Sequence, residues 1–282
     1  MQLGKFQILP ISDGLLKLDG GGLFGIVPKA IWRKLVEADD LNRTQVQTNC
    51  MLVRTPDRNV LVECGMGRKY GEKLRSIYDL HDDVTLVKSL AATGLQPEGI
   101  SDVILTHLHL DHAGSCTRLA SDGRSAVPIF PNATYHIQRG EWECATHPNP
   151  ATRGTYLAEN FVPLQQAGQL HLLDGDCEPI PGFRVRHTGG HTDHHQSVFV
   201  ESDGRTVVFM GDICPLAVNL RPAYNTAFDH HPLDSMRIKG AIFEEVIRNG
   251  WMIWLYHDTK ITAATLRHGK DQPEIAEVIL PT

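Results

Sequence analysis

Residues 106–114 read THLHLDHAG and place three histidines and one aspartate within six consecutive positions. The chain has 15 histidines among 282 residues, so chance is a poor explanation for a cluster this dense. Imidazole and carboxylate ligands without thiolates suit Zn²⁺, Mn²⁺, Fe²⁺ or Co²⁺, and these ligand types favour zinc. The stretch therefore predicts a transition-metal site.

The spacing within this stretch is compatible with two neighbouring metal ions. In an extended backbone, side chains two residues apart point the same way, so His107 and His109 could bind one ion together. Asp111 and His112 follow where the chain turns toward two small residues, and they could reach a second ion.

Four apolar runs end at, or lead into, a residue that can bind a metal. They are DVILT (102–106) before His107, FRVRHT (183–188) before His191, TVVFMGD (206–212) with Asp212, and WMIWLYH (251–257) with His257. A sheet holds side chains at strand ends rigidly while the following loop exposes them, so we expect these ends to meet at one pocket. His230 and His231 remain alternatives to His257. His195 is the candidate to orient a ligand through its ring.

The remaining pattern predicts one layered α/β domain over residues 1–282, because no repeat or linker divides the chain. Further strands are expected at FQILPI (6–11), NCMLVRT (49–55), NVLVECG (59–65), ATYHIQ (133–138) and QSVFVES (196–202), and helices at 83–93, 139–146 and 234–249. The turn sequence TPDRN joins the second and third of these strands into a hairpin. The segment TKITAATLRHGKDQPE reads as a strand and a tail.

The segment DGGGLFGIVPKAIWRKL reads as a mobile glycine-rich loop followed by a short helix. Leu23, Phe24 and Ile26 lie among its glycines, where they could form a hydrophobic lip over a pocket. The alternative is that the loop packs these side chains onto the core.

Composition narrows the class of protein. A net charge of −6 argues against a nucleic-acid partner, which usually meets a basic face. The six cysteines form no C-x-x-C pair, and we read them as reduced thiols. No window approaches the ~18 apolar residues of a membrane span, and no secretory signal opens the chain. A cytoplasmic protein without a membrane partner is therefore expected.

Taken in order, T-H-L-H-L-D-H, G-G-H-T, G-D-I and a strand-terminal histidine resemble the motifs of the metallo-β-lactamase superfamily over nearly the whole chain. The resemblance implies an αββα four-layer sandwich with two divalent metal ions at one edge of the sheets. It also implies these ligands: His107, His109 and His191 for the first ion, Asp111, His112 and His257 for the second, and Asp212 bridging both.

The resemblance implies hydrolysis by a hydroxide that bridges the two ions, with Asp111 taking the proton of the attacking water. Asp212 stands where many zinc β-lactamases carry Cys or Ser, and His109 replaces the Glu of the diiron flavoprotein branch. The chain is short for glyoxalase II. Among the remaining branches of the superfamily, the chain is similar to the quorum-quenching lactonases. This similarity implies a small-molecule lactone or ester substrate and, by analogy, a homodimer.

One departure bears on the substrate. Many acyl-homoserine lactonases place a tyrosine three residues after the bridging aspartate, and this chain has Pro215 there. Tyr224 is the candidate to supply the hydroxyl instead. The same metal site could also hydrolyse phosphotriesters or phosphodiesters, and an arginine such as Arg221 near the metals would favour anionic phosphates. A non-catalytic scaffold with structural metals is the third hypothesis.

Overall fold

Two seven-stranded sheets form the centre of the protein. The computed structural model describes residues 1–281. The first sheet contains, in spatial order, β1 (Gln2–Leu3), β2 (Phe6–Asp19), β3 (Arg43–Arg54), β4 (Asn59–Val62), β5 (Asp102–Ile104), β8 (Thr134–Gln138) and β9 (Leu170–Leu173). The second contains β10 (Cys177–Ile180), β11 (Phe183–His187), β12 (Gln196–Ser202), β13 (Arg205–Phe209), β14 (Met252–Trp254), β15 (Ile261–His268) and β16 (Pro273–Pro281). A separate ribbon pairs β6 (Thr117–Leu119) with β7 (Ala126–Pro128).

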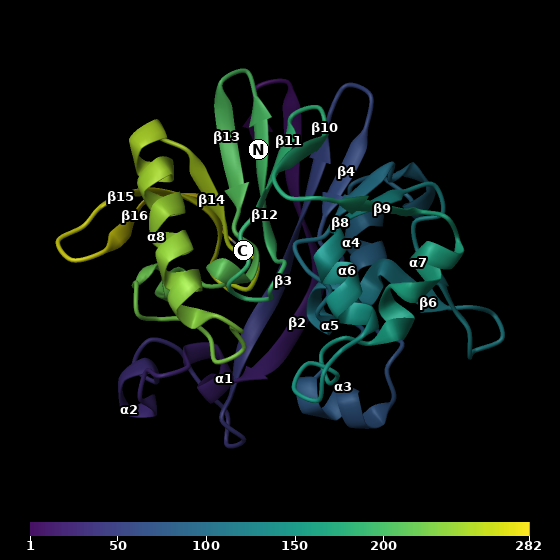
Figure 1. Ribbon diagram of the computed structural model, residues 1–282, viewed down its shortest axis with the longest axis horizontal. Coiled ribbons are helices and arrows are strands. Elements are labelled where there is room, and N and C mark those ends of the chain that lie inside the picture. Colours follow the sequence, from purple (N-terminus) through teal and green to yellow (C-terminus); the bar gives the residue numbers. More distant parts are fainter. Residues whose placement is uncertain (282) are drawn as a thin grey trace.

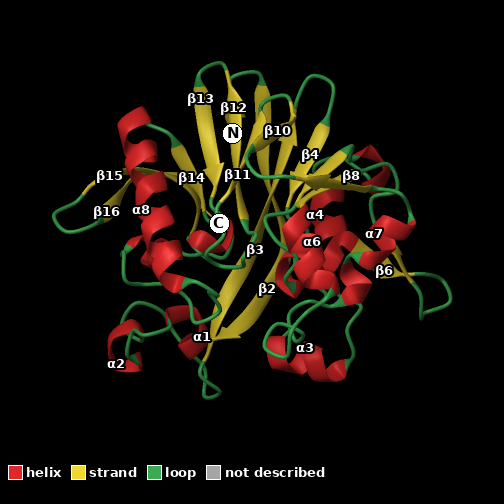
Figure 2. Ribbon diagram, in the orientation of Figure 1, coloured by secondary structure: helices red, strands yellow, loops and turns green. Residues whose placement is uncertain are grey.

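Helices lie on the outer faces of both sheets, as Figures 1 and 2 show. The α-helices are α1 (Gly20–Phe24), α2 (Lys29–Trp32), α3 (Glu72–Tyr78), α4 (Leu86–Ala92), α5 (Leu110–Ala113), α6 (Arg139–Thr146), α7 (Val162–Gln166) and α8 (Pro232–Asn249). Short 3₁₀ turns are η1 (Pro97–Gly99), η2 (Gly114–Cys116), η3 (Ala158–Asn160), η4 (Gly211–Ile213) and η5 (Ala217–Leu220). Helix α4 packs on β2 and α6 packs on β8 and β9, whereas α8 packs on β15 of the other sheet. The expected αββα layering is confirmed.

Strand periodicity explains why both faces of the second sheet are apolar. Side chains alternate between the faces of a strand. In β12, Val198 and Val200 join the core between the sheets, whereas Phe199 joins the core under α8. In β14, Trp254 faces the core between the sheets and Ile253 faces the core under α8. Strands buried on both faces read as continuous apolar runs.

Parallel strands direct several loops to one edge of the molecule. β4, β5, β8 and β9 run parallel in the first sheet, and β13 and β14 run parallel in the second. The loops that follow β5, β13 and β14 carry His107, Asp212 and His257. Because the carboxyl ends of neighbouring parallel strands meet at the same edge, the sheets bring these loops together.

Most of the predicted elements are confirmed, and two predictions are wrong. The predicted hairpin is the antiparallel pair β3–β4, and the helices predicted at 139–146 and 234–249 are α6 and α8. The expected tail after the first carboxyl-terminal strand is instead β16, which pairs with β15. The glycine-rich segment is not simply a loop, because Gly20–Phe24 form helix α1, with Asp19 accepting a hydrogen bond from the Gly22 N–H.

Within residues 1–281, no helix is both long enough and apolar enough to cross a membrane.

Candidate metal centre

Three of the predicted ligands form the first group. The rings of His107 and His109 lie 4.5 Å apart between centroids, and His191 lies 4.7 Å from His107 and 5.0 Å from His109. His191 Nε2 is 3.2 Å from His109 Nδ1. One nitrogen from each ring falls within 4.8 Å of the other two, which is a spacing that one metal ion could span.

The second group is equally compact. Asp111 and His112 belong to helix α5, and His257 follows β14. One ligand atom from each of the three lies within 4.8 Å of the other two. Asp111 Oδ2 is 3.5 Å from His257 Nε2, and Asp111 Oδ1 is 3.9 Å from His112 Nε2.

The carboxylate of Asp212 lies between the two groups. Its Oδ2 is 3.4 Å from His191 Nε2 in the first group. Its Oδ1 is 3.3 Å from His112 Nε2 and 3.5 Å from His257 Nε2 in the second group. Each oxygen of this one carboxylate therefore faces a different set of histidines, which is the arrangement a bridging ligand requires.

The protonation states of two imidazoles and of the central carboxyl suit metal binding. Burial lowers the pKa of His107 and of His109 well below the usual range, so both rings are neutral and have a lone pair to offer. Burial opposes the charged form of Asp212, but His112 and His257 outweigh it and the pKa of this carboxyl lies well below its usual range. The central carboxylate is therefore ionised.

Buried polar atoms in this cluster fit divalent cations. His107 Nε2, His112 Nε2, His257 Nε2 and Asp212 Oδ1 are buried and have no hydrogen-bond partner within residues 1–281. A buried polar atom without a partner costs free energy, and five imidazoles crowded against two carboxylates are expensive to bury. Metal ions would satisfy the lone pairs of all four atoms at once.

A second layer of groups orients three of the imidazoles through the far ring nitrogen. His107 Nδ1 is 2.9 Å from Thr106 Oγ1, and His257 Nδ1 is 2.8 Å from the Gln47 carbonyl oxygen. His191 Nδ1 is 2.9 Å from Asp229 Oδ1. Such contacts fix the tautomer and the ring plane of a metal-binding histidine.

Two further residues support the site and, like the three just described, were not predicted as part of it. Glu63 is fully buried after β4, where its φ of 67° is unusual for a residue with a side chain. Its Oε1 accepts a hydrogen bond from the Thr106 N–H at 2.8 Å, and its Oε2 is 3.5 Å from His112 Nδ1. The hydroxyl of Tyr256 donates to the Asp111 carbonyl oxygen at 2.6 Å. Both residues come shortly after a buried strand, and a carboxylate or hydroxyl in that position is the sequence signal that could have identified them.

His195 contacts the backbone of Asp212. Its Nε2 accepts a hydrogen bond from the Asp212 N–H at 3.2 Å, and its Nδ1 lies 2.7 Å from Thr188 Oγ1. Gly211 must be a glycine here, because its φ is 58° and a Cβ would lie 2.4 Å from His195 Nε2. The structure thus puts His195 behind Asp212, and its role in orienting a metal ligand stays a prediction.

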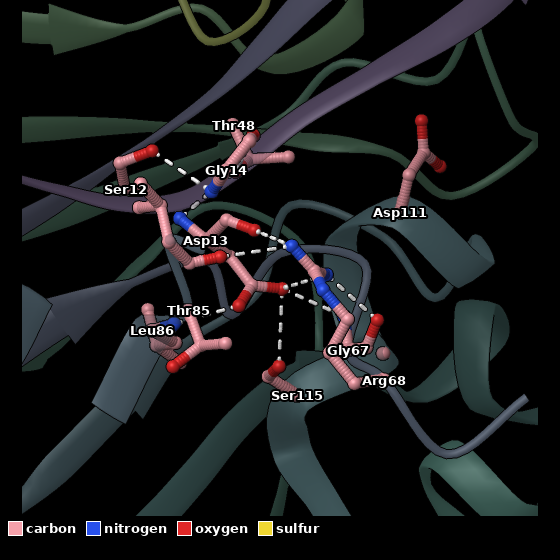
Figure 3. A network of polar contacts seen from close by, with 12 residues as sticks. Ser12, Asp13, Gly14, Thr48, Gly67, Arg68, Thr85, Leu86, Asp111 and Ser115 are labelled. Atoms are coloured by element: carbon pink, nitrogen blue, oxygen red, sulfur yellow. Dashed lines mark hydrogen bonds and ion pairs between the residues drawn. The ribbon is translucent and has the colours of Figure 1, made fainter. Parts of the chain in front are cut away.

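The buried carboxylate of Asp13 connects several loops near helix α5 through hydrogen bonds and an ion pair (Figure 3). Its Oδ2 accepts from the Gly67 N–H at 2.7 Å and from Ser115 Oγ at 3.1 Å, and lies 3.5 Å from the Arg68 guanidinium. Its Oδ1 accepts from the Leu86 N–H at 2.6 Å. Strand β2 is thereby joined to the loop after β4, to the start of α4 and to the turn after α5.

A cavity of about 350 Å³, hereafter the metal-site cavity, reaches both ligand groups. Five predicted ligands line it: His109, Asp111, His191, Asp212 and His257. Its other walls are largely apolar and include Leu18, Leu23, Leu41, Ile77, Leu110, Pro215 and Phe228.

The three predicted lip residues have different surroundings. Leu23 is buried and lines the metal-site cavity. Phe24 is fully buried and stacks on Trp32 with ring centroids 5.0 Å apart, so it belongs to the core. Ile26 is 87% exposed and does not line this cavity. Both alternatives therefore apply in part, because Leu23 lies at the cavity as a lip residue would and Phe24 packs in the core.

Other candidate residues lie away from the ligand groups. Tyr224 does not line the metal-site cavity, and its hydroxyl accepts a hydrogen bond from Arg221 Nη1 at 2.9 Å. Arg221 does not line that cavity either. The alternatives to His257 pair with Asp193 instead, His231 at 2.7 Å and His230 at 3.6 Å. These four candidates all follow Pro215 in the chain.

Sequence comparison relates the chain to lactonases. Residues 43–244 match the Metallo-beta-lactamase superfamily. An N-acyl homoserine lactonase of a Bacillus species is 30% identical over 164 residues, which are 55% of this chain and 58% of that relative. N-acyl homoserine lactonase AttM of Rhizobium radiobacter is 32% identical over 125 residues, 43% of each chain. The chain thus spans less than two thirds of the length of these curated relatives.

Solved structures share the fold over almost the whole chain. A probable metal-dependent hydrolase from Staphylococcus aureus is 31% identical, with a TM-score of 0.89 over 99% of this chain and 100% of that one. AidC, a dizinc quorum-quenching lactonase, has a TM-score of 0.79 over 99% of this chain and 97% of that one. Its identity to this chain is 18%, so that likeness concerns the fold alone.

Proposed function

The chain belongs to the metallo-β-lactamase superfamily, and from that membership we propose that it is a metal-dependent hydrolase of one domain, residues 1–282, that opens acyl-homoserine lactones or related lactones. The observation that carries this proposal is the position of Asp212, whose two oxygens face different histidine groups at an apolar cavity. The two lactonases described above, at 30% and 32% identity, support the substrate class.

We propose two divalent ions, most simply zinc. His107, His109 and His191 would hold the first ion, Asp111, His112 and His257 the second, and Asp212 both. When bound, such ions lower the pKa of a shared water and polarise the ester carbonyl. The unpartnered nitrogens of three of these histidines support this assignment.

Residues of the chain would accept a proton, hold the metal ligands in place and exclude bulk water. Asp111 lines the metal-site cavity, with a side chain that is 14% exposed, so one of its oxygens can accept the proton of the attacking water. His195 and Asp229 keep Asp212 and His191 in place from behind. The apolar wall excludes bulk water and suits an uncharged substrate.

Phosphotriester hydrolysis is the second candidate, because a neutral phosphotriester suits the same apolar cavity. Anionic phosphodiesters are disfavoured, since Arg221 pairs with Tyr224 outside the cavity. Two basic side chains, Arg43 and Lys17, do line the cavity, but both form ion pairs with Asp39.

A scaffold with structural metals is the third hypothesis, and such a scaffold would not need ligands that open onto a cavity. The cytoplasmic location and the homodimer stay predictions.

Metal analysis combined with a hydrolase panel tests the proposal. We expect about two transition-metal ions per chain and hydrolysis of lactones with varied acyl chains, with slower or no turnover of phosphotriesters and β-lactams. An Asp212→Asn variant should lose both metal and activity. A metal-loaded protein that opens no lactone would overturn the substrate class. One ion per chain, retained in Asp212→Asn, would favour the scaffold.

A further inference from the structure

The metal-site cavity has six polar side chains besides the predicted metal ligands: Lys17, Asp19, Arg43, Tyr78, Thr155 and Thr226. Five of them are held by other protein groups. Thr226 Oγ1 donates to Asp229 at 2.7 Å, and Thr155 Oγ1 donates to the Thr152 carbonyl oxygen at 2.9 Å. A donor engaged in this way has no hydrogen left for a substrate.

The charged members of the set are also engaged. Lys17 pairs with Asp79 at 2.9 Å and Asp39 at 3.4 Å. Arg43 pairs with Asp39 at 2.9 Å. Asp19 accepts hydrogen bonds from the Gly22 N–H at 3.0 Å and from the Asn42 amide.

The hydroxyl of Tyr78 differs from these groups. No residue in 1–281 forms a hydrogen bond with it. The Tyr78 side chain is partly buried, and this burial raises the pKa of its phenol to about 12, with a further contribution from the negative charge of Asp111. A phenol in this position keeps its proton at neutral pH and can serve as a hydrogen-bond donor.

The end of helix α3 is held so that Tyr78 stays in the cavity wall. Arg43 Nη1 donates to the carbonyl oxygens of Ser76 at 2.8 Å and Ile77 at 2.9 Å. The next residue, Asp79, ends the helix with a left-handed φ of 53° and forms its ion pair with Lys17. Contacts on both sides of Tyr78 thus tie it to β2 and β3, which reduces the entropy lost when its hydroxyl meets a ligand.

We propose that Tyr78 is a catalytic residue whose hydroxyl donates a hydrogen bond to an oxygen of the scissile ester group bound in the metal-site cavity. This assignment rests on the proposed lactone hydrolysis. Pro215 lines the same cavity but offers no substitute, because it has neither a backbone N–H nor a polar side chain. The hydrogen bond strengthens as negative charge develops on the ester oxygen in the transition state.

Tyr78→Phe tests the assignment, because it removes one oxygen and keeps the ring that packs in the wall. We expect kcat for an N-acyl homoserine lactone to fall about 100-fold with KM nearly unchanged. Metal content and melting temperature should match the wild type. An alkyl lactone without the acyl amide should show the same loss, since the hydrogen bond is made to the ring ester and not to the amide.

Tyr224→Phe is the comparison, because it removes the same hydroxyl outside the cavity and should leave kcat within about twofold of the wild type. A Tyr78→Phe enzyme with the kcat of the wild type would overturn the role of Tyr78 and leave the proposed lactone hydrolysis unaffected. So would a loss limited to KM, or a loss confined to the substrate with the amide. A wild-type protein that opens no lactone would overturn the proposed function and this assignment together.

Discussion

At the scale of single residues, several predicted ligands depend on a neighbour that the ligand motif does not contain. His191 is the clearest case, because Asp229 contacts its far nitrogen at 2.9 Å. Burial alone would lower the pKa of His191, but Asp212 and Asp229 outweigh it and raise that pKa. A carboxylate in this position makes an imidazole a stronger metal ligand and fixes its orientation.

We therefore expect Asp229→Asn to weaken metal binding about 10- to 100-fold, because the amide keeps the size but loses the charge. Competition with a chromogenic chelator measures the affinity. Asp193→Asn is the matched control, since Asp193 pairs with the partly exposed His230 and His231 and with no predicted ligand. Equal affinities for all three proteins would show that Asp229 does not tune His191.

At the scale of elements, close backbone packing shapes the wall of the cavity. Helix α1 and the loop around Phe228 meet where the Ala227 N–H donates to the Gly22 carbonyl oxygen at 2.7 Å. A Cβ on Gly22 would lie 2.1 Å from the Phe228 ring, and one on Gly25 would lie 2.7 Å from the Asn225 carbonyl oxygen. The glycines of this segment allow close contact, which differs from the mobility expected from the sequence.

Gly22→Ala should accordingly displace Phe228 and destabilise the protein by about 1 kcal/mol, the low end of the range for overpacking, because Phe228 is 40% exposed. KM for an acyl-homoserine lactone should rise, because Phe228 lines the cavity. Denaturant unfolding and steady-state kinetics measure the two effects. Gly240→Ala in α8 is the control: no atom lies within 4 Å of its Cβ position, and alanine favours a helix. Indistinguishable unfolding of the two variants would contradict this account of Gly22.

At the scale of the whole molecule, the candidate metal centre takes its residues from both sheets. The first sheet supplies His107 through the loop after β5, and the second supplies Asp212 and His257 through the loops after β13 and β14. Trp254 Nε1 donates to the Asn49 carbonyl oxygen at 2.6 Å, and the Asn49 amide donates to the Leu255 carbonyl oxygen at 3.1 Å, both from one sheet to the other. Ions held between the sheets would add to these contacts.

Chelation should for this reason lower the melting temperature. Metal present at about 1,000 times its dissociation constant stabilises the folded state by about 4 kcal/mol. For a chain of this size that corresponds to a shift of roughly 10 °C, measurable by differential scanning fluorimetry. An Asp212→Ala variant should show a much smaller shift with the same chelator. If the chelator leaves the melting temperature of the wild type unchanged, the result would argue against metal ions between the sheets.

Local sequence was sufficient for much of the fold and for the types of ligand. Helix α6 and strand β12 have the predicted bounds, because their periodic patterns are contained within a few consecutive residues. Strand β16 was missed because its stability comes from pairing with β15, which the local pattern does not reveal. Strands β9 and β10 were missed as well.

The sequence by itself determined that imidazoles and carboxylates follow strand ends, because THLHLDH holds four such residues within one short segment. Only the tertiary structure decided which distant groups support them and which tyrosine meets the cavity. Asp229 is 38 residues from His191, and Tyr224, not Tyr78, was the tyrosine that sequence favoured. Such contacts depend on strand pairing and loop packing across the whole chain, and local residue patterns carry no information about those distances.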